Sequence, residues 1–349
     1  MPPSPPDSGS ADVDALIVGA GPVGLYAAYC AGFRGLTVAL MDSLPEVGGQ
    51  VSAMYPEKMI HDVAGFPGVR GRDLVAGLAA QADRYEPVYA LGEQAASLSR
   101  EPGRVVVTAA SGLRIGARFV VVTGGIGTFS PRRLPSLRAF EGQGVVYFVP
   151  APEDYRGRDV AIVGGGDSAF DWALTLAPLA RSVTVVHRRE TFRAHEALVR
   201  QVRDQAVPII TGAEVVAAYG DGALEGIDVM DKRSRDVRRL AAQAVVAALG
   251  FTADIGPLQA WGLNIADRRI AVDSTMATNL ERVYAAGDIT AYPGKVRLIS
   301  VGFGEAATAV NNAVAALDPN ASVFPGHSSD VPAHAAGPAR EPARRASAA

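Results

Sequence analysis

The sequence contains only one cysteine, Cys30, among 349 residues. A disulfide within one chain needs two cysteines, so the sequence excludes an intrachain disulfide and any relay that passes electrons through a pair of thiols. A chain without disulfides is typical of the cytoplasm, and we expect a cytoplasmic location. Cys30 falls inside an expected helix, and we predict a buried structural thiol there rather than a reactive one.

Long hydrophobic runs, a secretory signal and a large net charge are also missing. No apolar stretch approaches the roughly 20 residues that a membrane-spanning helix needs. Residues 1–10 are rich in Pro and Ser and lack the basic and apolar segments of a secretory signal. The formal net charge of −3 gives no reason to expect nucleic-acid binding. We therefore expect neither a membrane nor a nucleic acid as a partner.

The sequence does contain two glycine-rich turns of the dinucleotide-binding type. Residues 19–24 read GAGPVG and residues 164–169 read GGGDSA, and each turn lies between a strand pattern and a helix pattern. In this context glycines allow a tight turn and let backbone N–H groups approach a pyrophosphate at the helix N-terminus. The residues that we expect to line the two pyrophosphate sites are Gly19, Gly21, Pro22 and Gly24 in the first turn, and Gly164, Gly166, Asp167 and Ser168 in the second.

The two turns differ at the end of the strand that follows each of them. Asp42 lies 23 residues after Gly19, whereas the run His187-Arg188-Arg189 begins 23 residues after Gly164. An acid at this place accepts hydrogen bonds from a ribose hydroxyl, while cations suit a 2′-phosphate. The sequence therefore predicts FAD at the first turn and NADP(H) at the second, where Arg193 adds a further cation. A chain that holds both cofactors is expected to be a flavin oxidoreductase.

The order of strand and helix patterns predicts an α/β protein with two Rossmann-like, three-layer dinucleotide-binding domains. We expect an NADP-binding domain at 124–250, inserted into a discontinuous FAD-binding domain at 12–123 and 251–324. Residues 1–11 and the distal part of a C-terminal extension at 325–349 are expected to be disordered. The expected helices span 22–33, 72–84, 167–179, 191–205 and 303–317, and the expected strands include 88–98 and 213–219.

A third pattern with a possible nucleotide role covers residues 284–288, which read YAAGD. An apolar strand that delivers a glycine and an acid suits the ribityl and phosphate part of FAD, with Asp288 accepting from a ribityl hydroxyl. The same pattern fits a plain strand-to-turn ending equally well. The helix expected after Gly302 would direct its positive N-terminal end at the flavin ring.

With these motifs, the sequence resembles the ferredoxin–NADP⁺ reductases of the thioredoxin-reductase-like type, a homodimeric bacterial family, over residues 14–330. The most specific segments are 48–50, 54–58, 62–67, 164–173, 187–189, 192–195, 302–306 and 326–329. The resemblance implies FAD and NADP(H) as cofactors, a ferredoxin or flavodoxin as redox partner, and a homodimer.

The resemblance also implies roles for individual residues. Tyr55 would stack on one face of the isoalloxazine ring, although its place in a proline-flanked loop also fits core packing. A tail with His327 and Ser329 would cover the other face, usually from the partner subunit, and assist proton movement at flavin N5. The remaining implied contacts are Asp42 on the adenosine ribose, Gln50 and Phe129 near the flavin, Ala96 near the adenine and Asp288 at the ribityl chain.

One departure separates this sequence from thioredoxin reductases, which share the architecture and carry Cys-x-x-Cys just before the second turn. Here residues 147–154 read YFVPAPED, so no dithiol can take electrons from the flavin. The expected reaction is hydride transfer from NADPH to flavin N5, followed by two one-electron steps to ferredoxin or flavodoxin. The alternatives are a flavin monooxygenase and a non-catalytic redox sensor that binds FAD and NADPH.

Overall fold

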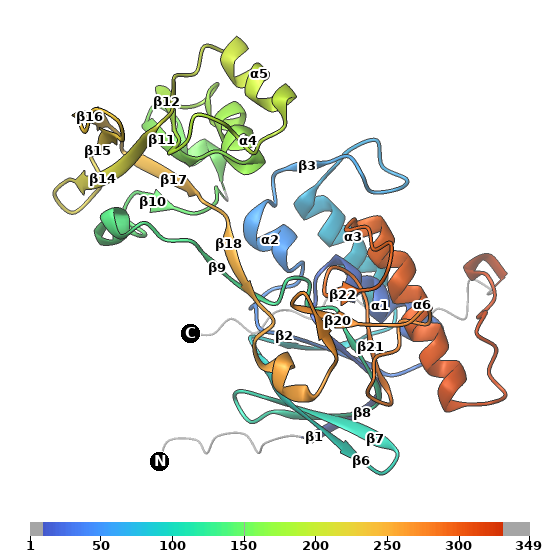
Figure 1. Cartoon of the computed structure of the whole chain (residues 1–349). Helices are drawn as coiled ribbons and strands as arrows, with labels where there is room; N and C mark the ends of the chain where they lie inside the picture. The colour runs from blue at the N-terminus through green and yellow to red at the C-terminus, as the bar shows by residue number, and fades with distance from the viewer. Residues whose placement is uncertain (1–9, 150, 331–349) are drawn as a thin grey trace, which may run out of the picture. The chain divides into compact units, whose positions relative to one another are not determined.

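The computed structural model describes residues 10–149 and 151–330, which divide into two compact units (Figure 1). Unit 1 comprises the residues up to Thr128 and from Asp254 onward, and unit 2 comprises Phe129–Ala253. The chain passes between the units along β9 (Thr128–Pro131) and β18 (Phe251–Asp254), which pair with each other. The boundaries expected at 124 and 251 fall close to these crossings.

Unit 1 is built on a seven-stranded sheet in the order β5-β2-β1-β8-β7-β6, with β21 also paired to β8. The strands β5, β2, β1, β8 and β21 are parallel, whereas β7 and β6 are antiparallel. Residues 15–18 form an apolar run that is buried on both faces, as is typical of parallel strands. These strands are β1 (Ser10–Val18), β2 (Val38–Asp42), β5 (Val88–Leu91), β6 (Ala95–Glu101), β7 (Arg104–Ala109), β8 (Arg114–Val122) and β21 (Val283–Ala285).

The side chains of this sheet alternate between two hydrophobic cores. Ile17 and Leu40 face the core that α1, α3 and α6 cover, whereas Leu16 and Met41 face a second core that contains Trp261. Helix α1 begins with a proline at its first position, where the missing N–H is not needed, and its bounds confirm the helix expected at 22–33. The helices of unit 1 are α1 (Pro22–Phe33), α2 (Gln50–Met54), α3 (Gly71–Asp83) and α6 (Ile299–Leu317), with the 3₁₀ turn η3 at Gly256–Trp261.

Cys30 lies on α1 and is buried in the helix-covered core. Burial raises the pKa of its thiol to about 12, against a weaker opposing effect of a hydrogen bond with Tyr26. A thiol with this pKa carries almost no thiolate at neutral pH, and the thiolate is the reactive form. The expectation of a buried structural thiol is therefore confirmed.

Unit 2 contains a five-stranded parallel sheet in the order β10-β17-β11-β12-β13, and a three-stranded antiparallel sheet β14-β15-β16. Ile162 and Phe170 lie in a core between the parallel sheet and the helices, and Val163 and Ile227 lie in a core between the two sheets. The elements are β10 (Val145–Val146), β11 (Asp159–Gly164), α4 (Asp167–Leu176), β12 (Ser182–Val186), α5 (Glu196–Asp204), β13 (Ile209–Ile210), β14 (Ala213–Tyr219), β15 (Gly226–Asp231), β16 (Val237–Ala241) and β17 (Ala244–Ala248).

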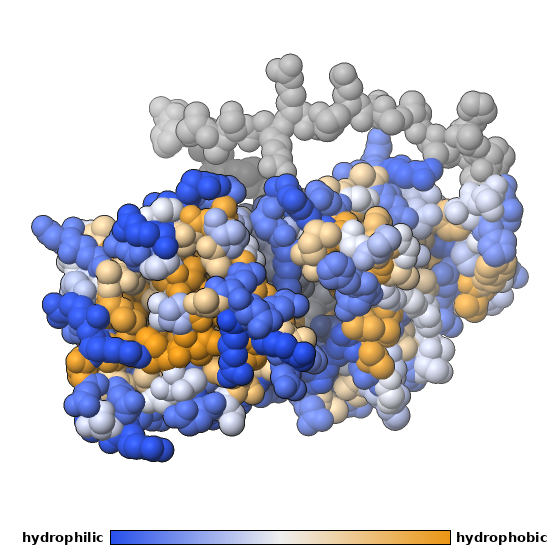
Figure 2. Space-filling model, turned by 90° about the horizontal axis from the view of Figure 1, so that it is seen from above, coloured by the Kyte–Doolittle hydropathy of each residue, from blue (hydrophilic) through white to orange (hydrophobic). Residues whose placement is uncertain are grey.

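Short elements complete the chain. They are β3 (Met59–Ile60) and β4 (Val69–Arg70), η1 (Pro135–Phe140), η2 (Pro152–Tyr155), β19 (Ile265–Ala266), β20 (Arg269–Ala271), β22 (Thr290–Ala291) and η4 (Ser328–Asp330). No helix in the described residues is both long and apolar enough to cross a bilayer. Figure 2 shows hydrophilic side chains spread over the face that it draws, around and between the hydrophobic ones.

The strand expected at 88–98 is wrong, because the chain forms two strands there. Strand β5 ends at Leu91, and the next two amides turn back to the end of β2: Gly92 N donates to Leu44 O (2.9 Å) and Glu93 N to Asp42 O (2.8 Å). The chain then enters β6, which lies at the other edge of the sheet and pairs antiparallel with β7.

Three expected helices also have different ends. The helix expected at 191–205 begins at Glu196 as α5, because the amides of Arg193 and Ala194 donate to Gly165 O instead (2.8 and 3.3 Å). The helix expected at 167–179 ends at Leu176, and the one expected at 303–317 begins at Ile299.

The expectation of disorder at residues 1–11 is wrong for the last two of them. Ser10 and Ala11 already pair with β8 at the start of β1, opposite Arg114 and Ile115. In the C-terminal extension, the proximal residues 325–330 are described, with η4 at Ser328–Asp330. Residues 1–9 and 331–349 lie outside the described residues.

Two helical glycines give a matched test of the packing of unit 1. A Cβ on Gly32 of α1 would lie 2.3 Å from Tyr85 Cβ, whereas a Cβ on Gly77 of α3 would meet nothing within 4 Å. We expect Gly32→Ala to lower the free energy of unfolding by about 1–3 kcal/mol through overpacking. Gly77→Ala should raise it by about 0.5–1 kcal/mol, because alanine favours a helix. Denaturant titrations of both variants measure the difference, and equal stabilities would contradict the packing.

Candidate functional site

The first glycine turn joins the end of β1 to the start of α1, and one of its three glycines has free space where a side chain would be. Gly19 has φ +116°, and an added Cβ would lie 2.7 Å from the backbone of Thr123. A Cβ on Gly24 would lie 1.8 Å from Gly19 O, so packing alone requires glycine at both positions. The nearest atom to a Cβ on Gly21 is Gly49 Cα at 4.0 Å. Packing therefore does not explain the glycine at 21, whereas the pyrophosphate expected at this turn would require it.

Asp42, at the end of β2, is fastened to this turn by both of its carboxylate oxygens. Oδ2 accepts from Ala20 N (2.6 Å) and Oδ1 accepts from Leu44 N (2.9 Å). Burial raises the pKa of the carboxyl group, while the amides of Leu44, Ala20 and Ser43 act to lower it. Each oxygen retains lone-pair capacity for a further donor, so the carboxylate can still accept from ribose hydroxyls.

Two further loops flank the first turn. Gly48 N donates to Ala20 O (2.8 Å), which brings the start of α2 against the turn. On the other side, Thr123 at the end of β8 donates through Oγ1 to Gly19 O (2.7 Å). Gln50 reaches across, because a Cβ on Gly125 would lie 2.8 Å from Gln50 Nε2. The structure thus brings Gln50 to the edge of the site, and adds Thr123, which sequence reasoning missed.

Tyr55 ends α2, is half-buried, and packs against the helix-covered core. Burial raises the pKa of its phenol, and the negative charges of Asp288 and Asp62 raise it further. Tyr55 is therefore a neutral aromatic side chain at physiological pH, within electrostatic range of Asp288.

Asp288 lies in the turn after β21, and the first turns of α1 and α6 both pack close to this turn. Gly287 has φ +83°, and an added Cβ would lie 3.2 Å from a methyl of Val23 in the first turn of α1. A Cβ on Gly302 would lie 2.5 Å from the same methyl and 3.4 Å from Gly287 Cα. Gly302 therefore lies inside α6, against the turn, and not before the helix as expected. No hydrogen bond to the Asp288 carboxylate exists among the described residues.

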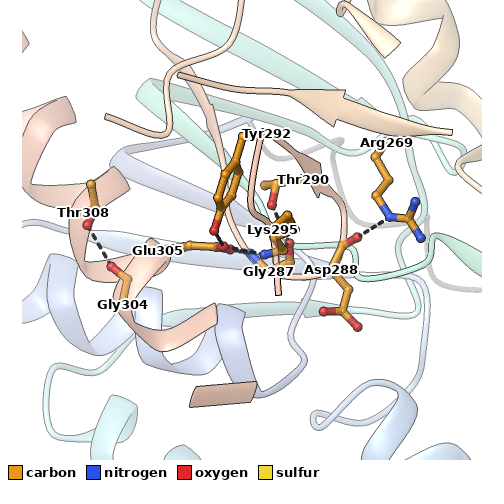
Figure 3. A network of polar contacts seen from close by, with 9 residues as sticks. All are labelled: Arg269, Gly287, Asp288, Thr290, Tyr292, Lys295, Gly304, Glu305 and Thr308. Carbon is orange, nitrogen blue, oxygen red and sulfur yellow. Dashed lines mark hydrogen bonds and ion pairs between the residues drawn. The ribbon is translucent and has the colours of Figure 1, made fainter. Parts of the chain in front are cut away.

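A buried polar network behind this turn was not foreseen from the sequence (Figure 3). Glu305 of α6 is 5% exposed and accepts from the amide of Gly287 and from the side chains of Tyr292 and Lys295. Glu305 belongs to segment 302–306, one of the segments that carry the family resemblance. A glutamate on a helix is nevertheless expected to be exposed to solvent. Only the tertiary structure shows that it meets a lysine.

The second glycine turn, in unit 2, follows the same scheme. A Cβ on Gly164 would lie 2.4 Å from Ala248 O, whereas a Cβ on Gly166 would meet nothing within 4 Å. Asp167 begins α4 and accepts through Oδ1 from His195 N (2.8 Å), so the loop before α5 is fastened to the turn. Ser168 is exposed beside it.

His187 and the arginines after it have different environments. A Cβ on Gly165 would lie 2.2 Å from the His187 ring, so the ring covers the turn, and His187 Nε2 lies 3.2 Å from Thr191 O. Burial lowers the pKa of His187, and the charges of Arg188, Arg189 and Arg193 lower it further, so the ring is neutral at pH 7. The three arginines are exposed. The positive charge beside the second turn therefore comes from the arginines alone.

The remaining expected site residues have no described contact with the glycine turns of their own units. Ala96, at the start of β6, accepts through its carbonyl from Trp261 Nε1 (3.3 Å). Phe129 lies on β9, and its side chain lies outside the described residues. His327 and Ser329 are exposed on the tail after α6.

The tail is attached to α1 at the end remote from the glycine turn. Arg34, which caps the C-terminus of α1, donates from Nη1 to Ser322 O (2.9 Å). A helix of 12 residues is about 18 Å long, and the glycine turn lies at its other end. No described contact joins His327 or Ser329 to Tyr55 within one chain.

Comparisons with known proteins agree with two nucleotide-binding units. Residues 13–313 match the family model of pyridine nucleotide-disulphide oxidoreductases. A ferredoxin–NADP reductase of Frankia alni is 62% identical over 90% of this chain and 98% of its own, and one of Thermus thermophilus is 46% identical over 91% and 96%. The chain belongs to the ferredoxin–NADP reductase group of this family. Among solved structures, the thioredoxin reductase of T. acidophilum is similar to this chain, with a TM-score of 0.74 and 25% sequence identity. The match covers 88% of this chain and 99% of that protein.

The free space beside the Cα atom of Gly21 allows a test of FAD binding at the first turn of this reductase. Gly21→Ala adds a methyl group that the protein can hold without a clash, but that group lies where the FAD expected at this turn would approach. We expect the thermal stability of the apoprotein to change little, and FAD affinity to fall by about tenfold or more. Flavin fluorescence titration and thermal melting measure the two effects.

Gly24→Ala serves as the control for this test. Its Cβ would collide with Gly19 O, so we expect a clear loss of stability even without FAD. Unchanged FAD affinity in Gly21→Ala would contradict a pyrophosphate at this turn.

Proposed function

We propose that this chain is an enzyme, a ferredoxin–NADP⁺ reductase that transfers electrons between NADPH and a ferredoxin or flavodoxin through FAD. The observation that carries the proposal is its identity of about three residues in five, along nine-tenths of the chain, with proteins of that name. The two glycine turns also support the proposal, because the strand after the first turn ends in an acid and the strand after the second is followed by arginines. When bound, FAD would accept a hydride from a nicotinamide and release electrons singly to the partner.

FAD fits unit 1. The open backbone at Gly21 would receive the pyrophosphate, at the N-terminus of α1. Asp42, already oriented by two amides, would accept from the adenosine ribose, and the free Asp288 carboxylate would accept from the ribityl chain. Neutral Tyr55 would offer an aromatic face to the ring, with Gln50 at its edge. Ala96 and Phe129 stay predictions, near the adenine and the flavin.

NADP(H) fits unit 2, which would be a domain inserted into the FAD-binding domain. The exposed guanidinium groups of Arg188 and Arg189 would bind the 2′-phosphate, because a planar guanidinium can hold two phosphate oxygens at once. Gly166 would admit the pyrophosphate. His187 is neutral, and we propose that it shapes the turn rather than supplying charge to the phosphate.

Electrons would leave this site without a thiol intermediate. The whole sequence contains one cysteine, and its buried thiol has a pKa of about 12, so this chain cannot form a redox-active dithiol. The partner would approach the flavin itself. We propose a homodimer in which the tail of a second copy, with His327 and Ser329, covers the exposed flavin face, because no described contact holds this tail at its own Tyr55.

The arginine pair predicts the choice of nicotinamide cofactor. Arg188→Ala combined with Arg189→Ala should raise KM for NADPH by about tenfold or more and change KM for NADH little, because NADH has no 2′-phosphate. Arg238→Ala, an exposed arginine on β16, serves as the control and should change neither. Steady-state kinetics with both cofactors measure this, and equal losses for NADPH and NADH would exclude the assignment.

The partner is tested by NADPH-driven reduction of cytochrome c with and without added ferredoxin or flavodoxin. We expect rapid reduction only when one of these proteins is present. A long-lived flavin hydroperoxide absorbance on mixing the reduced protein with O₂ would instead indicate a monooxygenase. Binding of both cofactors with no turnover would indicate a sensor, and either result would contradict the proposed reductase.

A further inference from the structure

The ion pair between Lys295 and Glu305 is the most deeply buried in the described part of the chain. The two side chains are 8% and 5% exposed, while every other ion pair found among the described residues has at least one partner that is clearly more exposed. Removing two charges from water is costly, and their attraction alone often fails to repay it. A buried pair at this place therefore suggests a task beyond stability.

The two side chains of the pair form hydrogen bonds with both the N–H and the C=O group of Gly287 (Figure 3). Glu305 Oε2 accepts from Gly287 N (2.7 Å), and Lys295 Nζ donates to Gly287 O (3.0 Å) as well as to Glu305 Oε1. Tyr292 donates its hydroxyl to the same Oε1. Both polar backbone groups of one glycine are thus held by oppositely charged side chains that also hold each other.

Two neighbouring side chains form further hydrogen bonds with the backbone of Gly287 and Asp288. Thr290 Oγ1 also donates to Gly287 O (2.8 Å), and Arg269 Nε donates to the backbone carbonyl of Asp288 (3.2 Å). Both of these bonds go to main-chain carbonyl oxygens. The Asp288 carboxylate takes part in none of the network's hydrogen bonds, and Figure 3 shows it turned away from the network.

A glycine needs such fixation because its backbone has more freedom than that of any other residue. Gly287 has φ +83° and directly precedes Asp288, so a change in its dihedral angles would redirect the Asp288 side chain. The network therefore fixes the backbone position from which the Asp288 carboxylate projects.

We propose that Lys295 and Glu305 are positioning residues, whose buried ion pair holds the Gly287–Asp288 turn so that the Asp288 carboxylate meets a ribityl hydroxyl of FAD. This inference rests on the proposed FAD site in unit 1. The contribution of the pair to FAD binding is made through Asp288.

A double-mutant cycle distinguishes this role from a general contribution to folding. Glu305→Gln keeps an oxygen for Gly287 N but leaves Lys295 without its counter-charge. In the otherwise unchanged full-length chain, stripped of flavin, we expect this variant to weaken FAD binding by about tenfold. In the Asp288→Ala background the same change should weaken it by less than about twofold, because the group that the pair positions is gone.

The double variant Lys295→Met with Glu305→Gln keeps the cycle measurable if the single variant folds poorly. It removes both charges at similar volume, so we expect more stability than in Glu305→Gln alone, while FAD binding stays weaker than in the parent. Asp14→Ala is the matched control. Asp14 lies near the start of β1, where it accepts from Thr37 N and Oγ1 and pairs with Arg118. Its loss should lower the melting temperature without changing FAD affinity.

The readouts are the FAD dissociation constant from flavin fluorescence and the melting temperature of each apoprotein. Equal losses of FAD affinity for Glu305→Gln in both backgrounds, or no loss in either, would overturn the positioning role. FAD binding is measured here without NADPH or ferredoxin. Failure of the proposed reductase activity would therefore leave this result standing, and the two failures can be told apart.

Discussion

The close contact between Gly24 and the carbonyl of Gly19 is the constraint on which unit 1 depends. It lets the first turn of α1 lie directly against the end of β1, with no side chain between them. Once the turn is closed, its free backbone groups become the anchor for the surrounding segments: Asp42 binds Ala20 N, Gly48 N binds Ala20 O, and Thr123 binds Gly19 O. The end of β2, the start of α2 and the end of β8 are thereby brought to the same edge of the sheet, where the carboxyl ends of parallel strands place ligands.

Unit 2 uses the same backbone arrangement with a different electrostatic outcome. Each turn contains glycines that packing requires and one glycine, Gly21 or Gly166, whose added Cβ would meet no close neighbour. In unit 1 the following strand ends in a carboxylate held by two amides, and in unit 2 it ends in a neutral ring over Gly165 with exposed arginines beyond. The two turns therefore share one backbone arrangement and differ in the charge at the end of the following strand, the difference on which the proposed choice of nucleotide rests.

Much of this structure could be predicted from the sequence because its signals are local. The glycine turns, α1 and β14 need only neighbouring residues, and the sequence predicts them well. The strand expected at 88–98 and the start of α5 were wrong for the opposite reason: amides at 92–93 and 193–194 bond to distant segments that no local pattern identifies. The site shows the same division. Asp42 and Asp288 follow from their motifs, whereas Lys295 and Glu305 are ordinary charged residues until the fold buries them together.

The pairing of β9 with β18 has a consequence for the history and engineering of this chain. Since the two strands are hydrogen-bonded neighbours, the entry and exit of unit 2 lie about 5 Å apart, the spacing of adjacent strands in a sheet. A segment with adjoining ends can be removed or exchanged without stretching the remainder, as in domain insertion. Unit 2 can therefore be exchanged as one continuous stretch of coding sequence. With the function proposed above, in which unit 2 binds NADP(H), such an exchange would give the enzyme a new nicotinamide preference.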